Sequence, residues 1–255
     1  MVSISRINLP TVDSTNSFVR AMLQEEGTGR VVSADPLPGF TLVVADDQTK
    51  GRGQQGNAWE TEKGKNLTFS LLCHPDFLLA SRQWVLSQCM AVAIQQTLSK
   101  YVERVEVKWP NDIYVGDEKI SGTLIECDLQ GKRISNCILG VGININQTVF
   151  RSDAPNPTSL KLLTGKEHDR EEILSLLLNH FQHFYAQLQD GHEDAIRQLY
   201  MQHLYRREGF HRYRDVRGEF LAEMADVEPT GHLRLRFADG NVVRYELKEV
   251  QFVKD

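Results

Sequence analysis

Three consecutive strand-like segments, joined by short turns, constrain the fold of this chain more than any other feature. They cover residues 105–115 (VEVKWPNDIYV), 119–130 (KISGTLIECDLQ) and 133–146 (RISNCILGVGININ), with turns at Gly116 and Gly131. Strands separated by so few residues pair with their neighbours in antiparallel fashion. The middle of the chain therefore predicts an antiparallel meander.

Helices and further strands are expected on either side of the meander. A short strand, a polar turn and a helix are predicted from about residue 8 to 23, and two more strands at 41–47 and 67–74. Apolar residues recur at helical spacing over about 81–101 and about 169–204. The predicted fold class is therefore α+β, with a mixed or antiparallel sheet and helices.

The carboxy-terminal part of the chain, from Arg206 onward, has a different character. Short segments of alternating apolar and polar residues are separated by the turn sequences PTG and DGN. Such turns between alternating segments indicate β-hairpins, and several hairpins in a small unit predict a small β-barrel. The sequence therefore predicts two domains, residues 1–205 and residues 206–255.

The composition is that of an ordinary globular protein. Of the 255 residues, 41% are hydrophobic and 25% are charged, and no apolar run approaches the length of a membrane span. The net charge of -5 argues against bulk binding of nucleic acid, although a local basic patch can still dock an acidic partner. The chain starts without a secretory signal pattern and its cysteines form no CxxC pair. A cytoplasmic protein with reduced thiols is therefore expected.

A glycine-rich loop, residues 50–59 (KGRGQQGNAW), follows a predicted strand directly. Its glycines let backbone amides approach a ligand closely, and Arg52 can pair with a carboxylate or a phosphate. Trp59 can stack on a base. The spacing is neither that of a Walker loop nor that of a dinucleotide-binding motif. Taken by itself, the loop fits an anion site and a plain surface loop equally well.

A second group of polar residues surrounds Pro110. This proline interrupts a strand-like segment, so it predicts a sheet edge or a bulge. Such a distortion of the strand can turn the neighbouring side chains toward a site. Asn111 offers a donor and an acceptor to a base edge, Asp112 can hold a magnesium ion, and Lys119 can neutralise a carboxylate or phosphate. The alternative is a solvated hairpin with a buried tryptophan.

The third motif, residues 140–146 (GVGININ), is a strand interrupted by two glycines. Missing side chains on a strand indicate that something packs against its backbone. A ligand ring and another strand are the two candidates, and the motif alone does not choose between them.

Together and in this order, these motifs resemble the biotin protein ligase family, also called biotin-[acetyl-CoA-carboxylase] ligase, along essentially the whole chain. The resemblance implies a class II synthetase-like catalytic domain and a small SH3-like carboxy-terminal barrel. The matching elements are DSTN (13–16), QTKGRGQQGNAW (48–59), KWPNDIY (108–114), KISGTLIE (119–126) and GVGININ (140–146).

The resemblance also implies an activity. Such enzymes activate biotin with ATP and magnesium as biotinyl-5'-AMP, releasing pyrophosphate. They then transfer biotin to a specific lysine of the biotin carboxyl carrier domain of a carboxylase. The expected partners are thus biotin, ATP and that carrier domain, with no nucleic acid or membrane, and the enzyme is expected as a monomer or a homodimer.

Residue roles follow from the same resemblance. The catalytic residues would be Arg52 and Lys119, and Asp112 would hold the magnesium ion. The residues implied for biotin are Ser14, Thr15, Asn16, Gln48, Gly51, Arg52, Gly53, Gln54, Lys119, Gly122 and Gly142. Those implied for ATP are Trp59, Lys108, Asn111, Asp112, Lys119 and Asn144.

The chain departs from the family pattern at two places. The family loop commonly reads GRGRRG, whereas this chain has the neutral amides of Gln54 and Gln55, so retention of the adenylate is expected to differ. Regulatory members carry an amino-terminal winged helix-turn-helix, for which the sequence before Asp13 leaves no room, so DNA binding is not expected.

Two other functions remain open. The nearest is a lipoate protein ligase, a related acyl-adenylate enzyme, although KWPND followed by KISG and a terminal barrel favours biotin. The other is a biotin-binding sensor without transfer activity. The presence of Arg52, Asp112 and Lys119 argues against the sensor.

Overall fold

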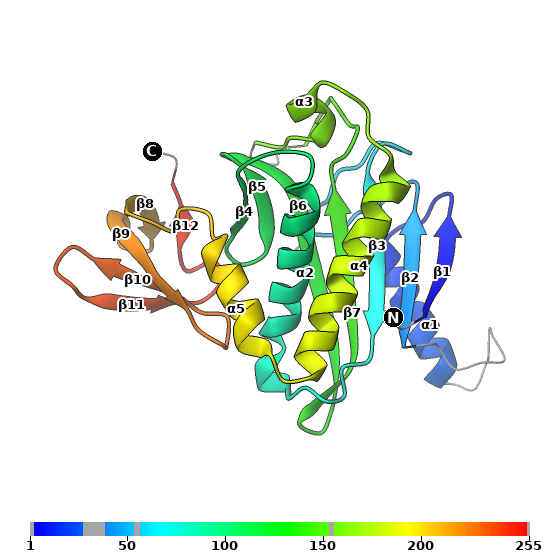
Figure 1. The fold of residues 1–255 in the computed structure, drawn as a ribbon, viewed down its shortest axis with the longest axis horizontal. Coiled ribbons are helices and arrows are strands. Elements are labelled where there is room, and N and C mark those ends of the chain that lie inside the picture. The colour runs from blue at the N-terminus through cyan, green and yellow to red at the C-terminus, as the bar shows by residue number, and fades with distance from the viewer. Residues whose placement is uncertain (1–2, 28–38, 54–56, 153–155, 254–255) are drawn as a thin grey trace.

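The computed structural model describes residues 3–27, 39–53, 57–152 and 156–253. Within these ranges the chain forms a seven-stranded mixed sheet flanked by helices and a separate five-stranded antiparallel sheet (Figure 1). The predicted α+β fold with a second, carboxy-terminal sheet is confirmed. No helix in the described ranges combines the length and the apolar character needed to cross a membrane.

The larger sheet has the strand order β1-β2-β3-β7-β6-β5-β4. The strands β1 and β2 run parallel because a helix connects them, and the other neighbouring pairs are antiparallel. The predicted meander is the run from β4 to β7. The bounds are β1 (Ile4–Leu9), β2 (Phe40–Ala45), β3 (Leu67–Cys73), β4 (Val105–Lys108), β5 (Asp112–Val115), β6 (Glu118–Gln130) and β7 (Arg133–Ile143).

Helices cover both faces of this sheet, which is why β2 and β3 are buried at every position. In Figure 1, α2 and α4 lie in front of the sheet and α1 lies behind it. On that rear face, Val19 packs with Val43, Leu72 and Ile138. The helices are α1 (Thr15–Gly27), α2 (Trp84–Leu98), α3 (Leu160–Thr164), α4 (Arg170–Gln189) and α5 (Glu193–Gln202), with a short 3-10 turn at Ala80–Arg82.

Residues 105–115 form two strands, so the single strand predicted there is wrong. The strands β4 and β5 are the arms of a hairpin in which Lys108 pairs with Asp112, and its turn contains a cis Trp109–Pro110 peptide bond. Proline lacks the backbone N–H that a strand ladder needs, so the strand ends before it. Pro110 does lie next to the edge strand β4, but in a turn and not in a bulge.

The smaller sheet has the order β11-β10-β9-β8-β12 and is antiparallel throughout. The Trp109 indole joins it to the larger unit, because Nε1 donates a hydrogen bond to the carbonyl oxygen of Gly231 at 2.9 Å. The boundary predicted between residues 205 and 206 falls between α5 and β8 and stays a prediction. The strands are β8 (Phe210–Asp215), β9 (Gly218–Val227), β10 (Leu233–Phe237), β11 (Val242–Tyr245) and β12 (Gln251–Phe252).

Candidate functional site

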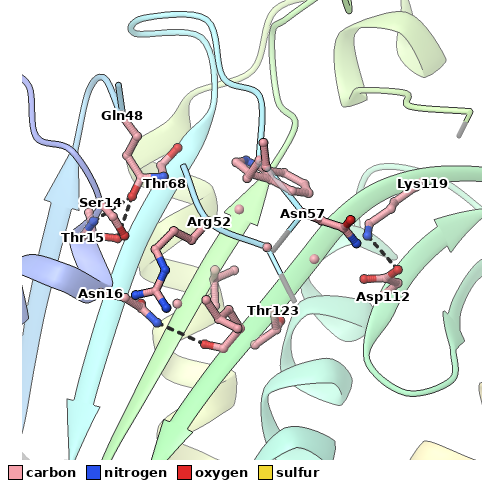
Figure 2. Close-up of a pocket in the computed structure, with 18 residues that line it drawn as sticks. Ser14, Thr15, Asn16, Gln48, Arg52, Asn57, Thr68, Asp112, Lys119 and Thr123 are labelled. Atoms are coloured by element: carbon pink, nitrogen blue, oxygen red, sulfur yellow. Dashed lines mark hydrogen bonds and ion pairs between the residues drawn. The ribbon is translucent and has the colours of Figure 1, made fainter. Parts of the chain in front are cut away.

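A pocket opens where the start of α1, the loop after β2 and the strands β6 and β7 meet (Figure 2). It brings together most of the residues predicted to bind biotin or ATP, namely Ser14, Thr15, Asn16, Gln48, Arg52, Gly53, Trp59, Asp112, Lys119, Gly122 and Gly142. The rest of its lining is Asn57, Ala58, Thr68, Thr123, Leu124, Gly140 and Val141. Segments far apart in the sequence therefore build one site.

The start of α1, together with Ser14 just before it, forms one wall of the pocket. The backbone N–H of Thr15 donates to Gln48 Oε1 at 2.7 Å, and the Thr15 hydroxyl lies 3.1 Å from the same oxygen. The buried Ser70 hydroxyl lies 2.7 Å from Thr15 Oγ1 and 2.6 Å from Asn16 Oδ1. The side chains of Thr15 and Asn16 thus bond to other elements of the site.

The glycine-rich loop folds back on itself as a narrow hairpin. The Trp59 N–H donates to the Gly51 carbonyl at 2.9 Å, and the Gly53 N–H donates to the Asn57 carbonyl at 2.6 Å. A Cβ atom on Gly51 would lie 2.3 Å from the Trp59 carbonyl oxygen, so only glycine permits this approach. The hairpin places Arg52 on its outgoing arm and Trp59 on its returning arm.

Side chains from other parts of the chain pack against Gly140 and Gly142 of β7. A Cβ atom on Gly142 would lie 2.2 Å from Cε2 of Trp59, and one on Gly140 would lie 2.1 Å from Oδ1 of Asn16. The sequence had predicted a ligand ring or another strand against these glycines. In this structure Trp59 and Asn16 pack there, and the buried Trp59 Nε1 has no hydrogen-bond partner among the described residues.

A methyl group at Gly142 should therefore damage the site. In a Gly142→Ala variant we expect Trp59 to be displaced and kcat/KM for the adenylation that the family resemblance implies to fall by about tenfold or more. Steady-state kinetics of pyrophosphate release would measure this. In a Trp59→Ala background, where the clash is absent, the same substitution should add little. A Gly142→Ala enzyme with wild-type kinetics would show that this packing is irrelevant to the reaction.

Two ion pairs set the electrostatics of the pocket. Lys119 Nζ lies 2.7 Å from Asp112 Oδ2, and Arg52 Nη2 lies 3.3 Å from Glu126 Oε1. The Lys119 ammonium also lies 5.9 Å from the ring centroid of Trp59. The side chains of Lys119 and Asp112 are 24% and 29% exposed, so both remain accessible to a ligand. An anion can replace an internal carboxylate as the partner of either cation.

Comparison with known proteins decides the family. Residues 24–144 match the profile of the Biotin/lipoate A/B protein ligase family. The biotin--[acetyl-CoA-carboxylase] ligase of Paracoccus denitrificans is 32% identical over 163 residues, which cover 61% of this chain and 67% of that protein. The chain belongs to the biotin/lipoate A/B protein ligase family. The predicted family resemblance is confirmed.

Longer relatives and solved structures agree with this family. The bifunctional ligase/repressor BirA of Bacillus subtilis is 29% identical over 219 residues, or 84% of this chain and 66% of that protein, just under two thirds of its length. The biotin protein ligase from Aquifex aeolicus, solved in complex with biotin and ATP, superposes with a TM-score of 0.76 at 23% identity. The superposition covers 98% of this chain and 99% of the Aquifex aeolicus chain, so the two share a fold.

Four residues assigned from the family resemblance lie outside the pocket lining: Gly51, Lys108, Asn111 and Asn144. The Asn111 amide donates to Ser87 Oγ at 3.0 Å and faces a neighbouring pocket that shares Leu124 with the first. The Asn144 amide donates to the Thr158 carbonyl at 2.9 Å. Their nucleotide roles stay predictions. Gln54 and Gln55, the two departures from the family loop, lie outside the described residues.

Lys108 lies at the junction of the two sheets. Its Nζ atom is 4.5 Å from the Tyr114 ring centroid and 5.4 Å from that of Phe252, and it donates to the Tyr114 hydroxyl at 3.1 Å. Burial among these rings lowers the pKa of Lys108, although Asp112 opposes the shift. In this structure an aromatic cage holds the lysine, and its predicted contact with ATP stays a prediction.

Some pocket residues on the sheet, among them Thr68 and Leu124, were not predicted from the sequence. A signal for Leu124 was present in the alternation of β6, because every second residue after Gly122 faces the same side. In the observed register Gly122 pairs with Gly142 and Leu124 pairs with Gly140. Once that register is known, Leu124 and then Glu126 lie on the same face of β6 as Gly122, and Leu124 lines the pocket.

Proposed function

We propose that this chain is a biotin protein ligase. It activates biotin with ATP as biotinyl-5'-AMP, releases pyrophosphate and transfers biotin to a specific lysine of the biotin carboxyl carrier domain of a carboxylase. The observation that carries the proposal is the pocket in which Arg52 and Lys119 face a wall of glycines beside Trp59. The names of the relatives support biotin as the acid.

The first step needs positive charge. The biotin carboxylate oxygen bonds to the α-phosphorus of ATP, and the bond from that phosphorus to the pyrophosphate oxygen breaks. Because both reactants are anions, cations must screen their approach and stabilise the charge that spreads over the phosphoryl oxygens. Lys119 and Arg52 line the pocket and are the residues that we propose for this role.

Asp112 fits a magnesium ion that arrives with ATP. Magnesium is commonly held by one or two carboxylates together with substrate phosphates and water. The described residues contain no group of three or more His, Cys, Asp or Glu side chains that could hold a metal on their own. Bound to the nucleotide, magnesium would neutralise phosphate charge. Asp112, on turning to it, would free Lys119 for the substrate.

The second step needs no nucleophile from this chain. The amine of the acceptor lysine attacks the acyl carbon, a new amide bond forms, and the bond to the phosphate oxygen breaks to release AMP. A mixed anhydride is sensitive to water, so the pocket must shield it. The Trp59 indole packs over Gly142 and Gly122 and provides an apolar cover for this purpose.

The family includes biotin and lipoate enzymes, so the choice of acid is the decisive test. The protein is incubated with ATP, magnesium and either acid, and pyrophosphate release is measured. We expect release with biotin and little with lipoate. Release with lipoate alone would overturn the biotin assignment, and release with neither acid would overturn adenylation itself.

A further inference from the structure

Glu126 links two parts of the site that are distant in the sequence. It lies on β6, opposite Ile138 of β7, and its side chain is 25% exposed. Its Oε2 atom accepts a hydrogen bond from Asn16 Nδ2 at 2.8 Å, and its Oε1 atom lies 3.3 Å from Arg52 Nη2. Figure 2 accordingly shows Asn16 and Arg52 close together at one side of the pocket.

The contact with Asn16 extends into a continuous polar network. Asn16 Oδ1 lies 2.6 Å from the hydroxyl of Ser70, which is fully buried. Ser70 in turn contacts Thr15, and Thr15 bonds to Gln48. Gln48 lies two residues before the glycine-rich loop and Arg52 lies within it, so both ends of the segment 48–52 are fixed to one network. Networks of this kind hold their members in place together.

The two carboxylates that pair with the pocket cations differ in position. Asp112 lines the pocket, where a ligand can displace it from Lys119. Glu126 is not part of the lining, so a ligand can bind while Glu126 keeps its contact with Arg52. Glu126 lies in a strand that is paired with β7, whereas the Arg52 side chain is 49% exposed on a loop. The carboxylate therefore fixes the arginine, and not the reverse.

We propose that Glu126 is a positioning residue that holds Arg52 and the outgoing arm of the glycine-rich loop against the pocket wall. Through Arg52 it sets how long the acyl-adenylate stays bound. The second statement rests on the proposed function, whereas the first concerns the loop alone. Because the ion pair is partly exposed, we expect its loss to have only a modest effect on adenylate retention. The hydrogen-bond network that holds Glu126 in place means that the loss is felt at Arg52.

The test compares Glu126→Gln with Asp128→Asn. Glutamine keeps the size of the side chain and an oxygen for Asn16, but it removes the charge that pairs with Arg52. Asp128 lies two residues further along the same strand and pairs with Arg20 outside the pocket, which makes Asp128→Asn a matched control. We expect Glu126→Gln to release the adenylate about threefold to fivefold faster, measured as biotinylation of a non-cognate protein, with the control unchanged.

A double-variant cycle separates positioning from general destabilisation. In an Arg52→Gln background, Glu126→Gln should have no further effect on adenylate release. Additive effects, or a Glu126→Gln enzyme equal to wild type, would overturn the proposal.

Amide hydrogen exchange of residues 48–53 provides a readout that does not need activity. We expect faster exchange in Glu126→Gln than in Asp128→Asn. Equal exchange would show that Glu126 does not hold the loop. Failure of the wild-type protein to use biotin would instead overturn the proposed function, and the exchange result would still decide the role of Glu126.

Discussion

Replacing Lys119 with alanine should reduce the rate of pyrophosphate release with biotin and ATP by about 100-fold or more. Lys119 lines the pocket, and its ammonium lies 2.7 Å from the Asp112 carboxylate and 5.9 Å from the centroid of the Trp59 ring. No other lysine lines this pocket, as far as the described residues show. Its loss leaves the Asp112 charge uncompensated where two anions must meet.

The control for this variant is Lys161→Ala. Lys161 lies on α3 and pairs with Glu167, and it does not line the pocket. We expect wild-type rates from Lys161→Ala and similar melting temperatures for both variants, because neither lysine packs in the hydrophobic core. A Lys119→Ala protein that melts and reacts like wild type would remove this residue from the mechanism.

The largest effect on stability is expected at Trp109. The side chain is 5% exposed and belongs to the main hydrophobic core, and its indole N–H bonds to the carbonyl of Gly231, in the turn between β9 and β10 of the smaller sheet. Trp109→Ala should lower the free energy of unfolding by about 3–5 kcal/mol, measured by urea denaturation. The loss combines a cavity in the core with a carbonyl left unpaired between the two sheets.

Trp109→Phe serves as the matched variant. It keeps an aromatic ring and loses the hydrogen bond to Gly231, so we expect a loss of about 1–3 kcal/mol, below that of the alanine variant. If Trp109→Ala costs less than about 1 kcal/mol, the indole does not join the two sheets in the way that the structure indicates.

Local signals predicted the parts of the fold that depend on neighbouring residues. The meander from β4 to β7 follows from strand-like segments and short glycine turns, and these patterns need no knowledge of distant contacts. Residues of DSTN, the glycine-rich loop and KISG, which the sequence grouped together, line one pocket. Their roles toward biotin and ATP stay predictions.

The remaining features depend on tertiary contacts that no local pattern encodes. The packing of Trp59 on Gly142 joins a loop to a strand more than eighty residues away. The contacts of Glu126 with Asn16 and Arg52 require the register of the sheet and the fold of the loop together. The hairpin at Pro110 was missed because the apolar pattern on both sides of it fits one long strand equally well.

The most direct test of the central claim is the intact mass of a biotin carboxyl carrier domain after incubation with this protein, ATP and magnesium. With biotin present, we expect the mass to rise by one biotinyl group on a single lysine, and substitution of that lysine should abolish the change. An unchanged carrier mass with biotin, together with a lipoyl group added to a lipoyl domain when lipoate is supplied, would contradict the account.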